Sequence, residues 1–436
     1  MRTAEVTKSC QIDLFAPQTE QRNAPPDPLT FVSNMDRPVH RWFRYSAGFS
    51  AEWAESTIAS EARKRGELRV FDPFAGSATT LLASESVGVE SWGIDAHPFV
   101  CRIAEAKLAY RTDPHEYLRS VRELKEAVLR VKASVGHYPI LITKCYDRAT
   151  LERLDLLRRA YEQVKDETPA SKLVWITLLA IVRKVSHAGT AQWQYVLPNH
   201  RKRKPLDVGQ AFEEAWRMVY ADLAARRSIR GPRSVFLQGD ARTCQGVPSR
   251  SFNLVITSPP YPNNYDYADA TRLEMSFLGE IDGWGDLHEA VRRHLVCSCS
   301  QHVSEKSMGL SSILSVPELE PIRAEISAVC GKLAEVRLTK GGRKTYHLMV
   351  ACYFRDLAQA WRALRRVCKT PCRLCFVIGD SAPYGVYVPV VPWMGRLAEA
   401  AGFASFTFRK TRDRNVKWKN RKHRVPLVEG ELWVEG

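Results

Sequence analysis

Apolar residues in this chain fall into short runs that each end at a polar or small residue. Several of these runs have the length and composition of buried strands. They are Leu68–Phe71, Trp92–Asp95, Ser234–Leu237, Phe252–Ile256 and Leu374–Ile378. Alternating Phe406 and Phe408, followed by Leu427–Val428 and Leu432–Val434, predict a closing antiparallel pair. Because helical patterns separate the runs, we expect an α/β fold with a sheet of about seven strands.

Residues 111–233, between the second and third strands, have helical periodicity and predict an inserted group of helices. The helical patterns are Leu118–Val131, Leu151–Val164, Leu173–Val185 and Val208–Ala225. The insertion contains the basic segment Asn199–Pro205 beside Trp193 and Tyr195. Basic residues among aromatic ones suit a DNA backbone with unstacked bases, although a solvated charge run has the same composition.

Residues 282–345 have weak periodicity and basic clusters such as Arg292–His294 and Lys340–Lys344. We expect irregular loops here, and irregular loops on a rigid sheet commonly carry recognition. This stretch and the helical insertion are therefore competing candidates for reading a target.

The turn Asp72–Thr80 follows the first predicted strand and precedes a helical run that begins at Leu81. A strand, a turn of small residues and a helix start form a cofactor cradle in open α/β sheets. Gly76 allows the backbone to approach a ligand closely, and the helix start offers free N–H groups. Asp95, at the end of the second strand, is placed to bind ribose hydroxyls.

The turn Thr257–Tyr261 follows the Phe252–Ile256 strand. Pro259 and Pro260 cannot donate to a strand ladder, and they stiffen the turn. The carbonyls of Ser258 and Pro259 are thus acceptors for an amine, beside the flat face of Tyr261.

These two turns resemble motifs of the DNA amino-methyltransferases, which use S-adenosylmethionine. Asp72–Thr80 resembles the cofactor motif D-P-F-x-G-S-G-T-T, and Ser258–Tyr261 resembles the catalytic motif [D/N/S]-P-P-[Y/F/W]. The Ser-Pro-Pro-Tyr form is most typical of the branch that methylates cytosine N4. The resemblance implies a Rossmann-like, seven-stranded methyltransferase sheet with a helical insertion. One departure is Ala78 in place of the usual last glycine, from which we expect a slightly altered pocket.

The resemblance also implies roles for individual residues. Cofactor binding is expected from Asp72, Pro73, Phe74, Gly76, Ser77, Thr79, Asp95 and Asp240, the last holding the adenine amino group. The catalytic residues are expected to be Ser258, Pro259, Pro260 and Tyr261, with Tyr261 stacking on a base flipped out of double-stranded DNA. The segment before the first strand, around His40–Ser50, is expected to close over the methionine end of the cofactor.

Other functions remain open from the sequence. Adenine N6 methylation is the main alternative, and RNA is a less favoured substrate because no RNA-binding module is recognisable. A non-catalytic DNA-binding pseudo-methyltransferase is a further alternative, supported only by Ala78. A site-specific enzyme of this kind belongs with a restriction endonuclease or another defence-system protein as its partner.

The net charge of the 436-residue chain, +16, suits a polyanionic partner such as DNA. We find no apolar run long enough for a membrane span and no signal segment, so we expect a cytoplasmic protein with no membrane partner. The odd count of 11 cysteines argues against a disulfide framework. Cys297-Ser298-Cys299 and the group Cys368, Cys372 and Cys375 lack a second paired cluster, so we expect reduced thiols and no metal.

These patterns divide the chain into four parts. We expect a flexible tail at 1–30, a catalytic domain made of 31–110, 234–281 and 353–436, a helical insertion at 111–233, and a candidate target-recognition region at 282–352.

Overall fold

The computed structural model describes residues 31–132, 136–191, 194–201, 204–303, 309–414 and 425–436. The expected tail at 1–30, Trp193 and the centre of the basic segment 199–205 lie outside the described residues. Among the described residues, no helix is long and apolar enough to cross a membrane.

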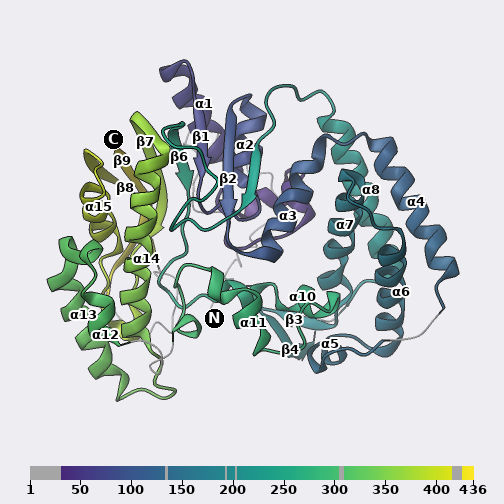
Figure 1. Ribbon diagram of the computed structural model, residues 1–436. Coiled ribbons are helices and arrows are strands. Elements are labelled where there is room, and N and C mark those ends of the chain that lie inside the picture. Colours follow the sequence, from purple (N-terminus) through teal and green to yellow (C-terminus); the bar gives the residue numbers. More distant parts are fainter. Residues whose placement is uncertain (1–30, 133–135, 192–193, 202–203, 304–308, 415–424) are drawn as a thin grey trace, which may run out of the picture.

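A seven-stranded sheet forms the centre of the molecule, with the strand order β5-β2-β1-β6-β7-β9-β8 (Figure 1). The strands are β1 (Arg69–Asp72), β2 (Glu90–Asp95), β5 (Val235–Gln238), β6 (Phe252–Thr257), β7 (Cys368–Gly379), β8 (Ser405–Arg414) and β9 (Leu427–Glu435). The first five strands in this order, β5, β2, β1, β6 and β7, pair in parallel. Strand β9 is antiparallel to both of its neighbours, β7 and β8. The prediction of an α/β fold with a seven-stranded sheet is confirmed.

Helices cover both faces of the sheet because successive strand residues point to opposite sides. The helices nearest the sheet are α1 (Ala51–Arg65), α2 (Thr79–Val87), α3 (Pro98–Leu108), α14 (Tyr346–Val367) and α15 (Val390–Ala400). Val70 and Leu254 pack with α1 and α2, whereas Phe71 and Val255 pack in the cluster that contains α14 and α15. This apolar alternation holds the strand ends, where the site lies, in a fixed arrangement.

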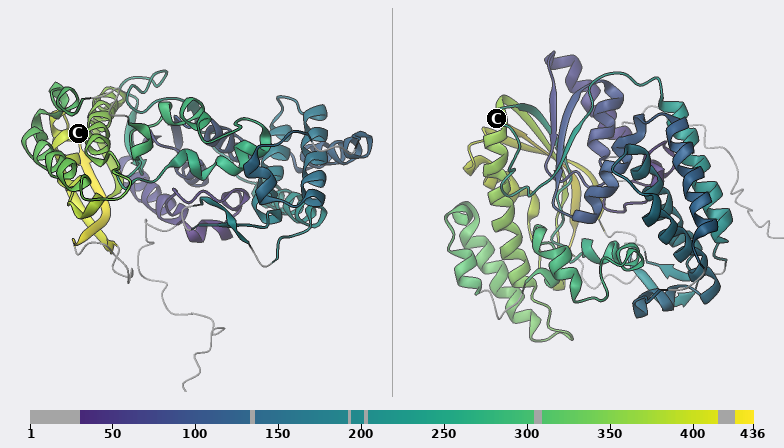
Figure 2. Two further views of the ribbon diagram at one scale, coloured as in Figure 1. Left: turned by 90° about the horizontal axis from the view of Figure 1, so that it is seen from below. Right: turned by 45° about the vertical axis from the view of Figure 1, so that its right-hand side comes forward.

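The insertion between β2 and β5 is helical and forms a separate lobe (Figure 2). Its helices are α4 (Pro114–Arg130), α5 (Ile140–Cys145), α6 (Arg148–Val164), α7 (Pro169–Val185) and α8 (Val208–Arg226). The side chains of Asp113, Asp147, Thr168 and Asp207 accept backbone hydrogen bonds at the starts of four of them. Sequence periodicity missed the small hairpin of β3 (Ala188–Thr190) and β4 (Val196–Arg201).

The expectation of irregular loops over 282–345 is wrong for a large part of this stretch. It contains α11 (Asp286–Ala290), α12 (Leu310–Leu314) and α13 (Arg323–Arg337). Apolar side chains of 310–337, such as Ile326 and Leu333, are buried in the same core cluster as α14. Helix α14 begins at Tyr346, so the domain boundary expected at 352/353 falls inside a helix.

Candidate active site

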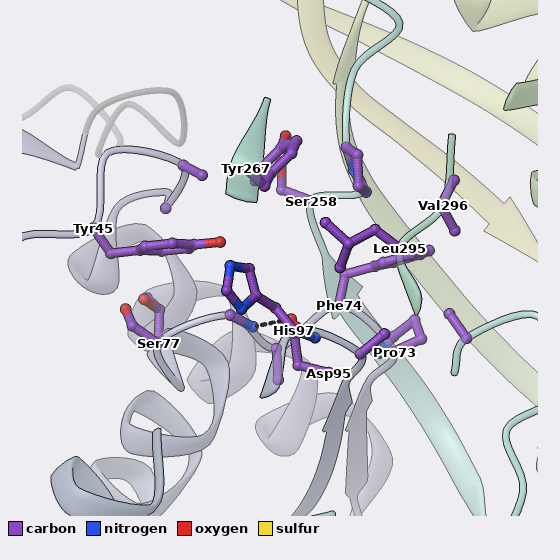
Figure 3. A pocket seen from close by; sticks show the side chains of 18 of the residues that line it. Tyr45, Pro73, Phe74, Ser77, Asp95, His97, Ser258, Tyr267, Leu295 and Val296 are labelled. Atoms are coloured by element: carbon purple, nitrogen blue, oxygen red, sulfur yellow. Dashed lines mark hydrogen bonds between the residues drawn. The ribbon is translucent and has the colours of Figure 1, made fainter. Parts of the chain in front are cut away.

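A pocket lies over the carboxyl ends of β1, β2, β5 and β6, and both sequence motifs reach it (Figure 3). The space within it, open solvent at its mouth included, is roughly 730 Å³. The residues predicted from sequence that line it are Pro73, Phe74, Gly76, Ser77, Thr79, Asp95, Asp240, Ser258 and Pro260. Asp72, Pro259 and Tyr261 are not among the lining residues. Gly76 and Ser258, far apart in the sequence, thus share one cavity.

Asp72 is fully buried and joins the two turns from beneath the pocket. Its carboxylate accepts hydrogen bonds from the hydroxyls of Thr257 and Thr80, both at 2.6 Å, and from the N–H of Phe74 at 3.0 Å. Burial raises the pKa of Asp72 to about 6, and these hydrogen bonds oppose the rise. Because Thr257 immediately precedes Ser258, Asp72 fixes the Thr257–Tyr261 turn relative to the Asp72–Thr80 turn.

Gly76 has a φ of +51°, a conformation that favours glycine. A Cβ atom there would lie 3.0 Å from the ring of Tyr45. The N–H of Gly76 donates to the carboxylate of Asp95 at 2.8 Å, and the N–H of His97 donates to its other oxygen at 2.9 Å. Burial raises the pKa of Asp95. Each carboxylate oxygen keeps a further lone pair, so Asp95 can still accept from a ligand hydroxyl.

Ala78 is left-handed, with a φ of +69°, and stands immediately before α2. Its methyl group packs with Ala75, Leu81 and Ala104, and it is not among the residues that line the pocket. The departure from glycine therefore acts on the backbone, where left-handed geometry costs a non-glycine residue roughly 1–2 kcal/mol. Ala78 contacts the pocket only through Ala75, which does line it, and the slightly altered pocket expected from Ala78 stays a prediction.

Asp240 lines the pocket at the end of β5 and is already paired. Its carboxylate contacts Arg242, with an Nη2–Oδ2 distance of 2.6 Å. Arg242 also reaches Asp356 and the carbonyl of His294. The backbone N–H of Arg242 also donates to Oδ1 at 2.8 Å, and its Nε contacts Oδ1 at 3.0 Å and Oδ2 at 2.8 Å. Both carboxylate oxygens are thus engaged by Arg242, so a ligand amine would have to displace one of these contacts.

The Thr257–Tyr261 turn is fixed by a carbonyl of the neighbouring strand β7. The hydroxyl of Ser258 donates to the carbonyl of Val377 at 3.1 Å, and the hydroxyl of Tyr261 donates to the same oxygen at 3.2 Å. The guanidinium of Arg414 lies 5.1 Å from the centre of the Tyr261 ring. Since the hydrogen of Ser258 is occupied, its oxygen presents lone pairs rather than a donor to the pocket.

Several lining residues were absent from the predicted set of site residues. Figure 3 shows Tyr45 on one side of the pocket, Leu295 and Val296 on the other, and Tyr267 near Ser258. Tyr45 lies within the aromatic segment that the family resemblance associates with closure over the cofactor, so the sequence did indicate this part of the pocket. Leu295 and Val296 carry no local motif and reach the pocket only through the fold.

His97 also lines the pocket and is buried. Its ring caps the start of α3 through the N–H of Val100 and lies 3.2 Å from the hydroxyl of Thr271. Burial lowers the pKa of His97 to about 4. The imidazole is therefore neutral at neutral pH.

The helical lobe contacts the segments that border the pocket. The side chain of Gln194 donates to the carbonyl of Arg44 at 2.7 Å and accepts from the N–H of Ser46 at 3.1 Å. The hydroxyl of Tyr195 accepts from the N–H of Asp266 at 2.7 Å. The lobe thus positions both the segment before β1 and the loop after the catalytic turn.

The strand order and the pocket over the carboxyl ends of the parallel strands define an α/β Rossmann-like methyltransferase fold. No family model matches the chain. It is 24% identical over 417 residues to the type II methyltransferase M.BsoBI of Geobacillus stearothermophilus, covering 86% of this chain and 80% of that protein. The chain is thus similar to a type II methyltransferase over most of its length.

Two further relatives are also type II methyltransferases. The type II methyltransferase M.AvaI of Nostoc sp. (strain PCC 7120 / SAG 25.82 / UTEX 2576) is 24% identical over 410 residues, covering 86% of this chain and 81% of that protein. The type II methyltransferase M.MvaI of Kocuria varians is 21% identical over 267 residues, covering 56% and 59%. The rRNA methyltransferase aviRa from Streptomyces viridochromogenes covers 57% of this chain and 77% of its own at 14% identity, and its TM-score of 0.23 is too low to carry an argument.

Proposed function

We propose that this chain is a DNA methyltransferase that uses S-adenosylmethionine and methylates the exocyclic N4 amine of cytosine. The observation that carries the proposal is the single pocket shared by Gly76 of the cofactor turn and Ser258 of the catalytic turn. The relatives add support because type II methyltransferases are the modification enzymes of restriction–modification systems. A net charge of +16 favours DNA as the partner.

The residues of the pocket fit S-adenosylmethionine by their chemistry. Asp95 retains acceptor capacity for ribose hydroxyls. Asp240 would accept from the adenine amino group in exchange for one of its contacts with Arg242. Tyr45 and Phe74 offer aromatic surface, and the left-handed Gly76 keeps the backbone open beside it. When bound, the cofactor supplies a methyl group activated by its sulfonium charge.

Ser258 would hold the amine hydrogens of the target base. An exocyclic amine is a poor nucleophile because its lone pair is delocalised into the ring. Acceptors at its hydrogens favour pyramidal nitrogen and align it for attack. The hydroxyl of Ser258 donates to Val377, so its oxygen is oriented as an acceptor. The carbonyl of Pro259 would be the second acceptor.

The base must leave the duplex to reach such a pocket. Tyr261 would offset part of the unstacking cost by stacking on the base, as the family resemblance implies. Its hydroxyl is anchored on Val377, which holds the ring in one orientation. Within a restriction–modification or defence system, a restriction endonuclease or other defence-system protein would be the functional partner.

The test is transfer of labelled methyl groups to unmodified DNA, followed by digestion to nucleosides. We expect label in 4-methylcytosine. Ser258→Ala should abolish transfer, and the matched control Ser311→Ala, on the exposed surface of α12, should retain it. Label in 6-methyladenine would reject the cytosine assignment, and absence of label in DNA would reject catalysis on DNA.

A further inference from the structure

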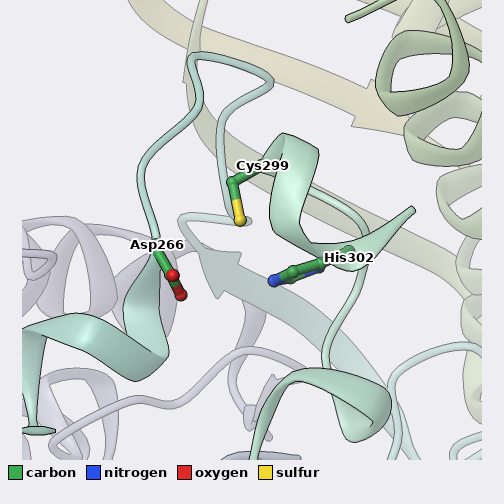
Figure 4. Close-up of side chains that lie close together, drawn as sticks. All are labelled: Asp266, Cys299 and His302. Atoms are coloured by element: carbon green, nitrogen blue, oxygen red, sulfur yellow. The ribbon is translucent and has the colours of Figure 1, made fainter. Parts of the chain in front are cut away.

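The loop after the catalytic turn and the 295–302 segment meet beside the pocket and bring three metal-ligand side chains together. Asp266, Cys299 and His302 each offer one ligand atom, and these atoms all lie within 4.8 Å of one another. Figure 4 shows the three side chains pointing into a common space. We propose that Asp266, Cys299 and His302 bind one Zn²⁺ ion, which holds these two segments together.

The spacing and the distances suit zinc. Cys299 and His302 form a Cys-x-x-His pair across the 3₁₀ turn Ser300–His302, so one short turn supplies two ligands. A tetrahedral ion with bonds of about 2.0–2.3 Å separates its ligand atoms by about 3.3–3.8 Å. Each distance between two ligand atoms would shorten by at most about 1.5 Å to meet that geometry. Thiolate, imidazole and carboxylate together favour zinc over magnesium or calcium.

His302 provides an independent sign of a missing ligand. Both of its ring nitrogens are shielded from solvent, and neither makes a hydrogen bond within the described part of the chain. Buried polar atoms are nearly always satisfied, so an unpartnered imidazole calls for a partner. Burial lowers the pKa of His302, and the nearby Val296 backbone opposes this shift. The Val296 carbonyl could therefore accept a hydrogen bond from the ring nitrogen that does not bind metal.

Cys299 is fully buried, and burial raises the pKa of its thiol to about 12. Without metal the thiol therefore stays protonated. Binding of Zn²⁺ would form the S–Zn bond and release one proton to solvent, as metal coordination of thiols requires. The electron pair of the S–H bond becomes the pair that sulfur donates, so no oxidant or reductant is needed.

Asp266 also serves other partners, which the ion must share. It pairs with the buried Arg292 at 2.8 Å and accepts from the N–H groups of Ala268 and Asp269, at 3.2 and 3.4 Å, at the start of α9 (Tyr267–Ala270). Ligating carboxylates commonly carry such outer hydrogen bonds. If the cluster binds no metal, Asp266 serves only as the ion-pair partner of Arg292 and as the N-terminal cap of α9.

The position of the cluster gives the ion a structural purpose. Asp266 immediately precedes the pocket residue Tyr267, and Cys299 and His302 follow the pocket residue Val296. The two segments already touch, because the N–H of Asn264 donates to the carbonyl of Ser298 at 3.1 Å. Zinc would lock this junction and with it one wall of the pocket.

The test measures metal in the purified full-length chain by mass spectrometry, after zinc loading and dialysis. We expect about one Zn²⁺ per chain, as for a single site, and less than about a tenth of that in Cys299→Ser and His302→Ala. The matched control is Cys297→Ser, which removes a buried thiol of the same segment outside the cluster and should keep its zinc. A metal-free loaded chain, or equal zinc in Cys299→Ser and the unmutated chain, would overturn the proposal.

Cobalt substitution makes the test independent of how the variants fold. Titration of the zinc-free, unmutated chain with Co²⁺ should produce a thiolate-to-cobalt charge-transfer band that saturates at about one equivalent. Zn²⁺ should then remove the band. If no such band forms, the assignment of Cys299 as a ligand is wrong.

Discussion

The helical insertion and the 310–337 segment both pack apolar side chains in the core, but in the described ranges only the helical insertion also donates or accepts hydrogen bonds at the borders of the pocket. The helical insertion shares one apolar core cluster with the segment before β1 and with α3, and Gln194 and Tyr195 add hydrogen bonds to the borders of the pocket. The 310–337 segment packs its apolar side chains on α14 and α15. Among the described residues, none of 310–337 lines the pocket.

This difference separates two ways in which an addition can serve a fold. Apolar packing is non-directional and extends the core without specifying the position of any one loop. Hydrogen bonds to backbone groups are directional, so they fix the loops that they contact. Both regions first considered for target recognition reach the site: Leu295 and Val296 of 282–345 line the pocket, and Gln194 and Tyr195 of the helical insertion hydrogen-bond to its borders. Both therefore stay candidates for reading the target.

The largest expected effect follows from breaking the buried ion pair that joins the lobe to the site. Arg183 of α7 contacts Glu274 of α10 (Arg272–Leu278) at 2.5 Å, and the Glu274 side chain is fully buried. Arg183→Met should lower the free energy of unfolding by about 3–5 kcal/mol, since it leaves a buried carboxylate without its partner. Urea denaturation measures the change.

The control for Arg183→Met is Arg148→Met. Arg148 pairs with Glu152 on the surface of α6 and is 89% exposed, so its loss should cost under about 1 kcal/mol. Equal losses in the two variants would remove the distinction between buried and surface ion pairs in this lobe.

A smaller effect is expected at Tyr195, whose hydroxyl accepts from the N–H of Asp266. Tyr195→Phe leaves that N–H unsatisfied and should cost about 1–3 kcal/mol of stability. Because Tyr267 follows Asp266, misplacement should also slow methyl transfer, by up to about tenfold for 1.4 kcal/mol. Denaturation and initial transfer rates measure the two effects.

Tyr220→Phe on α8 serves as the matched control for Tyr195→Phe. Within the described part of the chain, the Tyr220 hydroxyl makes no hydrogen bond, so both stability and transfer should be unchanged. A Tyr195→Phe enzyme that matches this control in rate would show that the lobe does not position the site.

The smallest effect is expected in the 310–337 segment. Glu325 is 54% exposed, and hydrogen bonds from Arg396 and then from Trp393 lower its pKa to about 2. Its folded pKa is below its unfolded value, so its stabilisation is present above about pH 4.5 and is lost as the pH falls toward about 2.

Solvent screening keeps the contribution of Glu325 under about 1 kcal/mol. Glu325→Gln should therefore change stability only slightly at neutral pH, flatten the stability curve between about pH 4.5 and 2, and leave transfer unaffected. Denaturation at several pH values and a transfer assay check these outcomes. Slower transfer in this variant would contradict the separation of the 310–337 segment from the site.

Local patterns predicted the sheet well because strand periodicity and turn chemistry are short-range signals. The run Phe252–Ile256 and the turn after it depend on neighbouring residues alone. Helix α13 was missed because its start has no side-chain cap and because its apolar residues are buried by packing on α14. Periodicity alone cannot identify such a partner.

The pocket was partly predictable for the same reason. The motif residues Gly76 and Ser258 could be recognised from the residue types and order of their motifs, whereas Leu295 and Val296 line the pocket only because of tertiary packing. Ala78 shows the opposite limit. The alanine in place of glycine was visible in the sequence, but its left-handed backbone conformation could be known only from the structure.

The most direct measurement separates cofactor binding from methyl transfer in Ser258→Ala and Tyr261→Ala. Calorimetry with S-adenosylmethionine and labelled transfer to DNA are run on the same preparations. If the two turns form one active site, both variants bind the cofactor within a few-fold of the unmutated chain and transfer no methyl group. Unimpaired transfer in both variants would contradict the account.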